Sequence, residues 1–233
     1  IISESENDIL NWKIGTNTGV YTVPFTTSNA VKIPLDIEVN VSGIAGSGIE
    51  FSTYGTATEL NTPFPNGVTN LAGCAGADNS LNIIDRFWRI EAVGYTTKPA
   101  VELSFGYDDG AAEMGGTNTI TEANLKAKRY NLGTNSWEVP QLLYGTANIT
   151  QNRVNGAIVS PTDFHSIWTL VDSTSITTGC DTDGDLVPDY VEDADGTDPN
   201  DPTVYVDADG DLVPDYVENQ DGTDPNDNTD FTD

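Results

Sequence analysis

The sequence has few basic residues: 9 Lys and Arg stand against 37 Asp and Glu, for a formal net charge of −28 over 233 residues. Recognition of nucleic-acid phosphates needs a basic surface, so we expect no nucleic-acid partner. No apolar run approaches the ~20 residues of a membrane-spanning helix, so we expect no membrane insertion. One His and two Cys exclude a histidine-based metal cluster and a dense disulfide framework. Cations are the favoured partners.

The acidic residues are unevenly distributed along the chain. Residues 181–233 contain 19 Asp and Glu and no Lys or Arg, whereas residues 1–180 contain the other 18 acidic residues and all 9 basic ones. A small, polar stretch (DSTSITTG) precedes the acidic end and is typical of a linker. We therefore predict a folded domain over residues 1–172, a linker over 173–180 and an acidic module over 181–233.

The first domain has the pattern of an all-β protein. Apolar residues alternate with polar ones from Val31 to Val41, which indicates a strand with one buried face, and Pro34 indicates an edge or a bulge. Further strands are predicted over 9–14, 20–25, 49–54, 85–95, 100–107, 125–131, 147–152, 156–159 and 165–171, with one helical turn over 121–124. The predicted fold class is all-β: an antiparallel β-sandwich followed by a largely irregular acidic segment.

The acidic module consists of a repeat. Residues 181–201 (DTDGDLVPDYVEDADGTDPND) and 207–227 (DADGDLVPDYVENQDGTDPND) are identical at 18 of 21 positions, with a period of 26. In each repeat, oxygen-bearing groups occupy positions 1, 3, 5, 7, 9 and 12 of a calcium-binding loop. The expected ligands are Asp181, Asp183, Asp185, Val187 (through its carbonyl), Asp189 and Glu192, and in the second repeat Asp207, Asp209, Asp211, Val213, Asp215 and Glu218.

Charge repulsion is the physical reason for a cation here, because carboxylates at alternate positions cannot converge without one. An all-oxygen set favours Ca²⁺ over zinc, which prefers His and Cys, and over the smaller Mg²⁺. The second half of each repeat adds acidic and amide groups that either complete these sites or form separate ones. These additional candidates are Asp195, Asp198, Asn200, Asp201, Asp221, Asp224, Asn226 and Asp227, so we expect two to four ions.

Position 6 of each loop departs from the usual calcium-loop pattern. Glycine normally allows a sharp turn there, but Leu186 and Leu212 occupy it. Either the backbone follows another path or each leucine is strained. Pro188 and Pro214 follow, where a helix would otherwise begin.

The motif D-x-D-G-D-x-x-P-D-Y-x-E followed by D-G-T-D-P-N-D resembles the thrombospondin type 3 repeat family. That resemblance implies a segment without a conventional core, wound around calcium ions. The alternative is an acidic disordered tail, which composition alone favours, but the conserved register of Pro, Tyr and Val between the two copies argues against it. Without calcium we expect the segment to be disordered.

The first domain carries a series of short motifs: DRFWRI (85–90), GYTTKPA (94–100), ITEANL (120–125), RYN (129–131), Trp137 and WTL (168–170). The series resembles a β-sandwich region of Bacteroidota cell-surface proteins exported by the type IX route. The resemblance implies a secreted, extracellular or cell-surface location, a place in a larger polypeptide beside neighbouring domains, and a non-enzymatic structural or adhesion role. A surface glycan or another protein is then the expected partner.

Two alternatives use the side chains of the first domain. A carbohydrate-binding module needs exposed aromatics, for which Trp88, Tyr130 and Trp137 are candidates, although core packing is the favoured interpretation. A carboxylate-based glycoside hydrolase is the second alternative, but nothing singles out one acidic pair. His165 is expected to be a packed residue.

Two modifications are also predicted. Cys74 and Cys180 are candidates for a disulfide that ties the first domain to the repeats. The triplet Asp172-Ser173-Thr174 resembles a Bacteroidota O-glycosylation motif, with Ser173 as the acceptor.

Overall fold

The computed structural model describes residues 1–46, 48–58, 60–71, 78–131, 136–137, 144–164, 167–173 and 181–230. These residues belong to two compact units. The described part of the first unit ends at Ser173, and that of the second begins at Asp181. Cys74, His165 and Cys180 lie outside the described residues.

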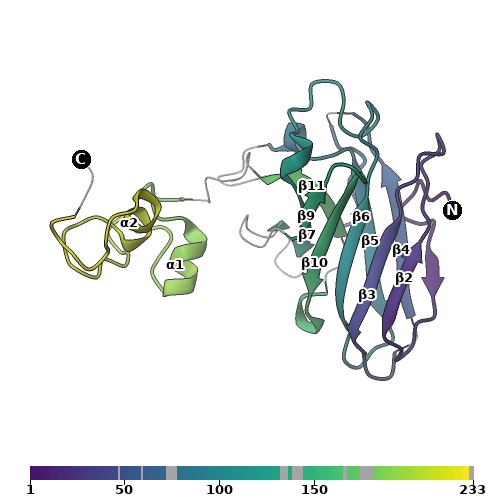
Figure 1. The fold of residues 1–233 in the computed structure, drawn as a ribbon, viewed down its shortest axis with the longest axis horizontal. Coiled ribbons are helices and arrows are strands. Elements are labelled where there is room, and N and C mark those ends of the chain that lie inside the picture. The colour runs from purple at the N-terminus through teal and green to yellow at the C-terminus, as the bar shows by residue number, and fades with distance from the viewer. Residues whose placement is uncertain are drawn as a thin grey trace. The chain divides into compact units, whose positions relative to one another are not determined.

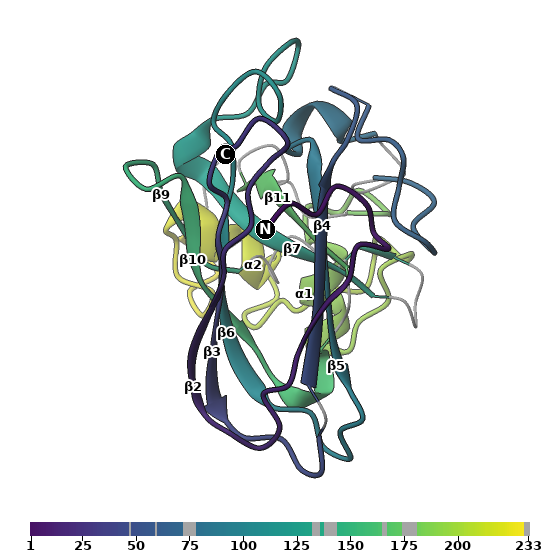
Figure 2. The same ribbon diagram turned by 90° about the vertical axis from the view of Figure 1, so that its right-hand side faces the viewer.

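The first unit is a sandwich of two antiparallel sheets, which confirms the predicted all-β class (Figure 1). The six-stranded sheet has the order β1-β4-β5-β11-β7-β8, and the five-stranded sheet has the order β2-β3-β6-β10-β9. Figure 2 shows the two layers edge-on, with β2, β3 and β6 in one and β4 and β5 in the other. The strands are β1 (Leu10–Trp12), β2 (Gly19–Val23), β3 (Leu35–Val41), β4 (Gly48–Gly55), β5 (Arg86–Val93), β6 (Ala100–Gly106), β7 (Leu125–Asn131), β8 (Ser136–Trp137), β9 (Thr146–Asn148), β10 (Arg153–Val159) and β11 (Ile167–Asp172).

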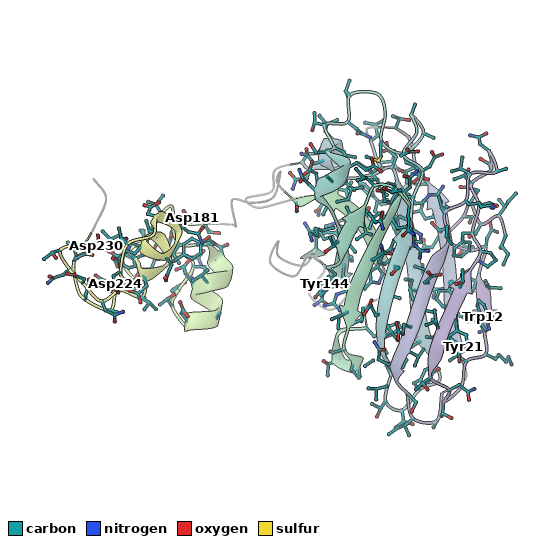
Figure 3. All side chains as sticks on the ribbon, viewed as in Figure 1. Trp12, Tyr21, Tyr144, Asp181, Asp224 and Asp230 are labelled. Atoms are coloured by element: carbon teal, nitrogen blue, oxygen red, sulfur yellow. The ribbon has the colours of Figure 1, made fainter. Side chains whose placement is uncertain are left out.

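The core lies between the two sheets and contains aromatic rings in edge-to-face and tilted contact. Phe105 of the five-stranded sheet contacts Trp88 and Trp168 of the six-stranded sheet, with ring centroids 5.2 and 5.4 Å apart. At one side of the sandwich, Trp12 of edge strand β1 meets Tyr21 of edge strand β2 at 5.8 Å (Figure 3). These contacts join the two layers.

The outer face of the six-stranded sheet carries a second aromatic cluster. Phe87 and Trp88 are neighbours in β5, so their side chains point to opposite faces. Phe87 stacks on Trp137 at 6.2 Å, and Trp137 meets Tyr130 edge-on at 5.1 Å. Backbone carbonyls of residues 67 and 70 accept the Tyr130 hydroxyl at 3.1 Å and the Trp137 indole N–H at 2.9 Å. The loop before β5 therefore covers this face.

A buried ion pair lies at the end of the sandwich where β5 begins. Arg86 donates through Nε to Glu113 and through a second nitrogen to Thr53 Oγ1 at 3.1 Å. Arg86 and Glu113 are 2% and 1% exposed. Glu4 approaches the same guanidinium at 3.8 Å and accepts the backbone N–H of Ser28 at 2.8 Å. The pair is therefore nearly fully desolvated.

The elements differ from the sequence predictions in several places. The strand predicted from Val31 begins only at Leu35, because Pro34 has no N–H to donate to a ladder. The predicted strand over 147–152 is shorter, since β9 ends at Asn148 and a turn precedes β10. The short strand β8 was not predicted. The predicted helical turn is a 3₁₀ turn over Glu122–Asn124, and the Thr121 side chain makes no capping hydrogen bond.

The second unit contains one short helix per repeat, α1 (Asp189–Asp195) and α2 (Asp215–Asp221). Each helix begins directly after a proline, at Pro188 and Pro214. The expectation that these prolines interrupt helix formation is therefore wrong. Proline has a helix-compatible φ and lacks an N–H that a helix start would leave unpaired, so it marks the beginning of each helix. No described helix meets the length and apolarity needed to cross a membrane.

Candidate metal centre

Three aspartates converge in each repeat. Asp181, Asp183 and Asp185 each offer a carboxylate oxygen, and these oxygens lie within 4.8 Å of one another. Asp207, Asp209 and Asp211 form the same arrangement in the second repeat. Each triad can hold a metal ion, as the spacing at positions 1, 3 and 5 predicted.

The aspartate at position 1 organises the backbone of its loop. Asp181 Oδ1 accepts the N–H of Gly184 at 2.6 Å, and its Oδ2 accepts the N–H of Leu186 at 2.9 Å. In the second repeat, Asp207 accepts the N–H groups of Gly210 and Leu212 at 2.7 and 3.0 Å. These hydrogen bonds turn the chain so that the later carboxylates face the first one.

The aspartates at positions 3 and 5 each use one oxygen and leave the other free. Asp183 and Asp185 accept backbone N–H groups through Oδ1, from Asp185 and Val187 respectively. The Oδ2 atoms of both are buried and have no hydrogen-bond donor. Asp209 and Asp211 repeat this division.

The glutamate at position 12 is the most unusual group of each loop. Glu192 and Glu218 are 0% and 1% exposed, and neither oxygen of either carboxylate has a hydrogen-bond partner. A buried carboxylate normally requires hydrogen bonds or a countercharge. Each repeat therefore contains four free, buried carboxylate oxygens: two from the glutamate and one each from the aspartates at positions 3 and 5.

Without a cation, burial and neighbouring negative charges destabilise the ionised form of the glutamate in each loop. Burial, together with the negative charges of Asp183 and Asp185, raises the pKa of Glu192 to about 7. Burial and the nearby aspartates likewise raise the pKa of Glu218. A hard cation fits this donor set, because it would compensate the charges and supply the missing partners of the free oxygens.

Both leucines at position 6 adopt the left-handed conformation that glycine favours, with φ of 75° at Leu186 and 77° at Leu212. The backbone therefore keeps the sharp turn, and each leucine bears the strain. Their side chains are 67% and 79% exposed. The strain is not offset by burial of the leucine side chains.

The residues at positions 7 and 9 of each loop do not belong to the aspartate triads. Val187 is 3% exposed, so its side chain is buried. Asp189 accepts the N–H and the hydroxyl of Thr182, both at 2.7 Å. Asp215 accepts the N–H of Ala208 at 2.7 Å. These carboxylates close the loop at the start of each helix and are not members of the triads.

Most acidic residues in the second half of each repeat accept hydrogen bonds from backbone N–H groups two residues later in the chain. Asp198 accepts the N–H of Asn200 at 3.1 Å, and Asp201 accepts that of Thr203 at 3.2 Å. Asp224 and Asp227 make the same turns with Asn226 and Thr229. Asp195 and Asp221 end the two helices. Among the described residues, the structure brings together no third group of three or more His, Cys, Asp or Glu side chains that could hold a metal ion.

The candidate residues of the sandwich are buried or hydrogen-bonded. Trp88, Tyr130 and Trp137 are at most 8% exposed, so they offer no platform to a sugar. The Ser173 hydroxyl donates to the carbonyl of Asn124 at 2.8 Å, and O-glycosylation there stays a prediction. The proposed disulfide involves residues outside the described ranges.

The helices α1 and α2, which contain Glu192 and Glu218, were missed at the sequence level. The signal was present, since proline followed by aspartate is a favourable helix start. The buried Arg86–Glu113 pair was also missed, and its separation of 27 residues in the chain carries no recognisable motif.

Comparisons with protein families, with curated proteins and with solved structures found no match to this chain.

Proposed function

We propose that each repeat binds one Ca²⁺ ion and that the chain is a non-enzymatic extracellular module, structural or adhesive, of a larger protein. The observation that carries the proposal is the set of four buried, unpartnered carboxylate oxygens in each loop. An all-oxygen donor set of this charge favours calcium over zinc. The similarity of the repeats to the thrombospondin type 3 family and of the sandwich to type IX-exported Bacteroidota surface proteins supports the same proposal.

Calcium would act mechanically in this proposal. The repeat segment has no Lys or Arg to balance its acidic residues, so without a cation its carboxylates repel one another. The ordered loops and the helices α1 and α2 then depend on the bound ion. A calcium-stiffened segment would serve as a spacer between the sandwich and a surface or a neighbouring domain.

Calcium titration by calorimetry tests the proposal. We expect two ions per chain, and one ion after either Glu192→Gln or Glu218→Gln, because each substitution removes a charge from one loop only. The matched controls are Asp198→Asn and Asp224→Asn, which remove the same charge from a turn outside the triads. An unchanged stoichiometry in the glutamine variants, or equal losses in the controls, would contradict it.

A further inference from the structure

One row of side chains crosses the outer face of the five-stranded sheet. Val20 of β2 lies opposite Glu38 of β3, Glu38 lies opposite Glu102 of β6, and Glu102 lies opposite Ile158 of β10. The residues that alternate with them along these strands fill the core, so all four point outward. The row therefore places two glutamates at directly opposite positions of neighbouring strands, between two aliphatic residues.

The two carboxylates are uncompensated. Neither Glu38 nor Glu102 has a hydrogen bond or an ion pair with any residue that the structure describes. Like charges directly opposite each other on neighbouring strands destabilise a sheet. In the adjacent row, by contrast, the carboxylate of Asp36 is neutralised by Arg153, which donates a hydrogen bond to it at 2.6 Å. The sheet thus carries a repulsive pair for which the fold supplies no cation.

The aliphatic ends of the row are open to solvent. Val20 is 64% exposed and Ile158 is 67% exposed. Gly156 of β10 has no side chain, and the one atom within 4 Å of where its Cβ would lie is Glu102 Oε1, at 3.8 Å. A partner lying across the strands can therefore reach both the charges and the apolar ends.

We propose that this face of the five-stranded sheet docks an extended, basic segment of a partner protein. A Lys or Arg side chain offers a cationic head to the facing carboxylates and an aliphatic stem to Val20 and Ile158. Charge complementarity of this kind fixes the register of a partner and speeds its association. A second copy of this chain is a poor occupant, because its net charge is −28. The inference does not depend on calcium binding by the repeats.

The test uses the full chain in excess calcium and 150 mM salt, with a fluorescent nine-residue peptide that alternates lysine with valine as the probe. Glu38→Gln and Glu102→Gln are each expected to weaken peptide binding at least fivefold. Val20→Ser and Ile158→Ser are expected to weaken it about threefold. The matched control is Asp109→Asn, which removes one charge from an exposed loop and is expected to leave the affinity unchanged.

Two results would overturn the proposal. One is an equal loss of binding in the Asp109→Asn control, which would show attraction by net charge alone. The other is no difference between the wild-type chain and the two glutamine variants. Thermal unfolding provides a check on folding, because removing one member of a repulsive pair should leave the melting temperature unchanged or raise it.

Discussion

Asp181 Oδ2 accepts the backbone N–H of Leu186 at 2.9 Å, and this hydrogen bond belongs to a turn in which the leucine has a φ of 75°. The same relationship joins Asp207 to Leu212 in the second repeat. The left-handed conformation costs a non-glycine residue roughly 1–2 kcal/mol. If each loop binds an ion as proposed, part of the binding free energy would offset the strain of its leucine.

Replacing either leucine with glycine should tighten calcium binding at its own loop. The substitution relieves the backbone strain, but glycine loses more entropy when the loop becomes ordered. The net gain in binding free energy is about 1 kcal/mol, which lowers the Kd about fivefold. Calorimetry on Leu186→Gly and Leu212→Gly measures it. Leu186→Ala is the control, because alanine keeps the Cβ that causes the strain. Equal affinities for the Gly and Ala variants would show that the strain is not what limits binding.

Chelation should expose the repeats to proteolysis. The segment contains Tyr190, Tyr205 and Tyr216 as chymotrypsin sites, whereas trypsin has none after residue 180. When calcium is present at 100 times its Kd, the open form falls about 100-fold, and cleavage should slow to a similar extent. Gel electrophoresis of timed digests, with and without a chelator, measures the rates. Chymotryptic cleavage of the repeats at the same rate in both conditions would contradict calcium-dependent ordering.

Lys128 of β7 should destabilise the sandwich at neutral pH. Its side chain is 3% exposed, and burial lowers its pKa to about 8. The unfolded state therefore binds the proton more tightly than the folded state, so stability rises as the pH increases from about 8 to about 10.5. Lys128→Met should stabilise the domain at pH 7 by up to about 3 kcal/mol, and this advantage should shrink over that pH range.

Urea unfolding of both chains, followed by tryptophan fluorescence, checks the Lys128 prediction. All four tryptophans precede residue 169, so the signal reports on the sandwich and not on the repeats. Titration of other groups affects both chains equally and cancels in the difference. A stability difference that stays constant from pH 7 to 10 would show that the lysine is charged in both states throughout.

Removing only one charge of the Arg86–Glu113 pair should destabilise the fold more than removing both charges. Glu113→Ala leaves a buried guanidinium without its main partner, and we expect a loss of about 3–5 kcal/mol. Arg86→Met combined with Glu113→Met removes both charges, so it should cost much less than the sum of the two single substitutions. A double-mutant cycle by urea unfolding measures this coupling, and additive losses would contradict it.

Local periodicity was sufficient to predict most strands and both aspartate triads. Alternation identifies a half-buried strand such as β3. A spacing of two residues brings Asp181, Asp183 and Asp185 together within a single loop. The position of Leu186 was predicted to be either strained or differently routed, and the structure shows strain. Each of these features is encoded within a short stretch of sequence.

Features that depend on distant contacts were not predictable in the same way. Glu38 lies opposite Glu102 because β3 and β6 are neighbours in the sheet. This strand order cannot be predicted from the local sequence pattern. The burial of Trp137 depends on a loop about 70 residues earlier that accepts its indole N–H. The first contact depends on the order of the strands in the sheet, and the second depends on the loop that covers the sheet.

The hydrogen bonds made by the aspartate triad of each repeat stay within its own twelve-residue loop. These hydrogen bonds position the first aspartate of each triad without a contribution from the other repeat. Insertion or deletion of one 26-residue unit would therefore leave the remaining loops intact and change the reach of the segment by a fixed increment. In the proposed spacer, the number of repeats would then set the length of the segment.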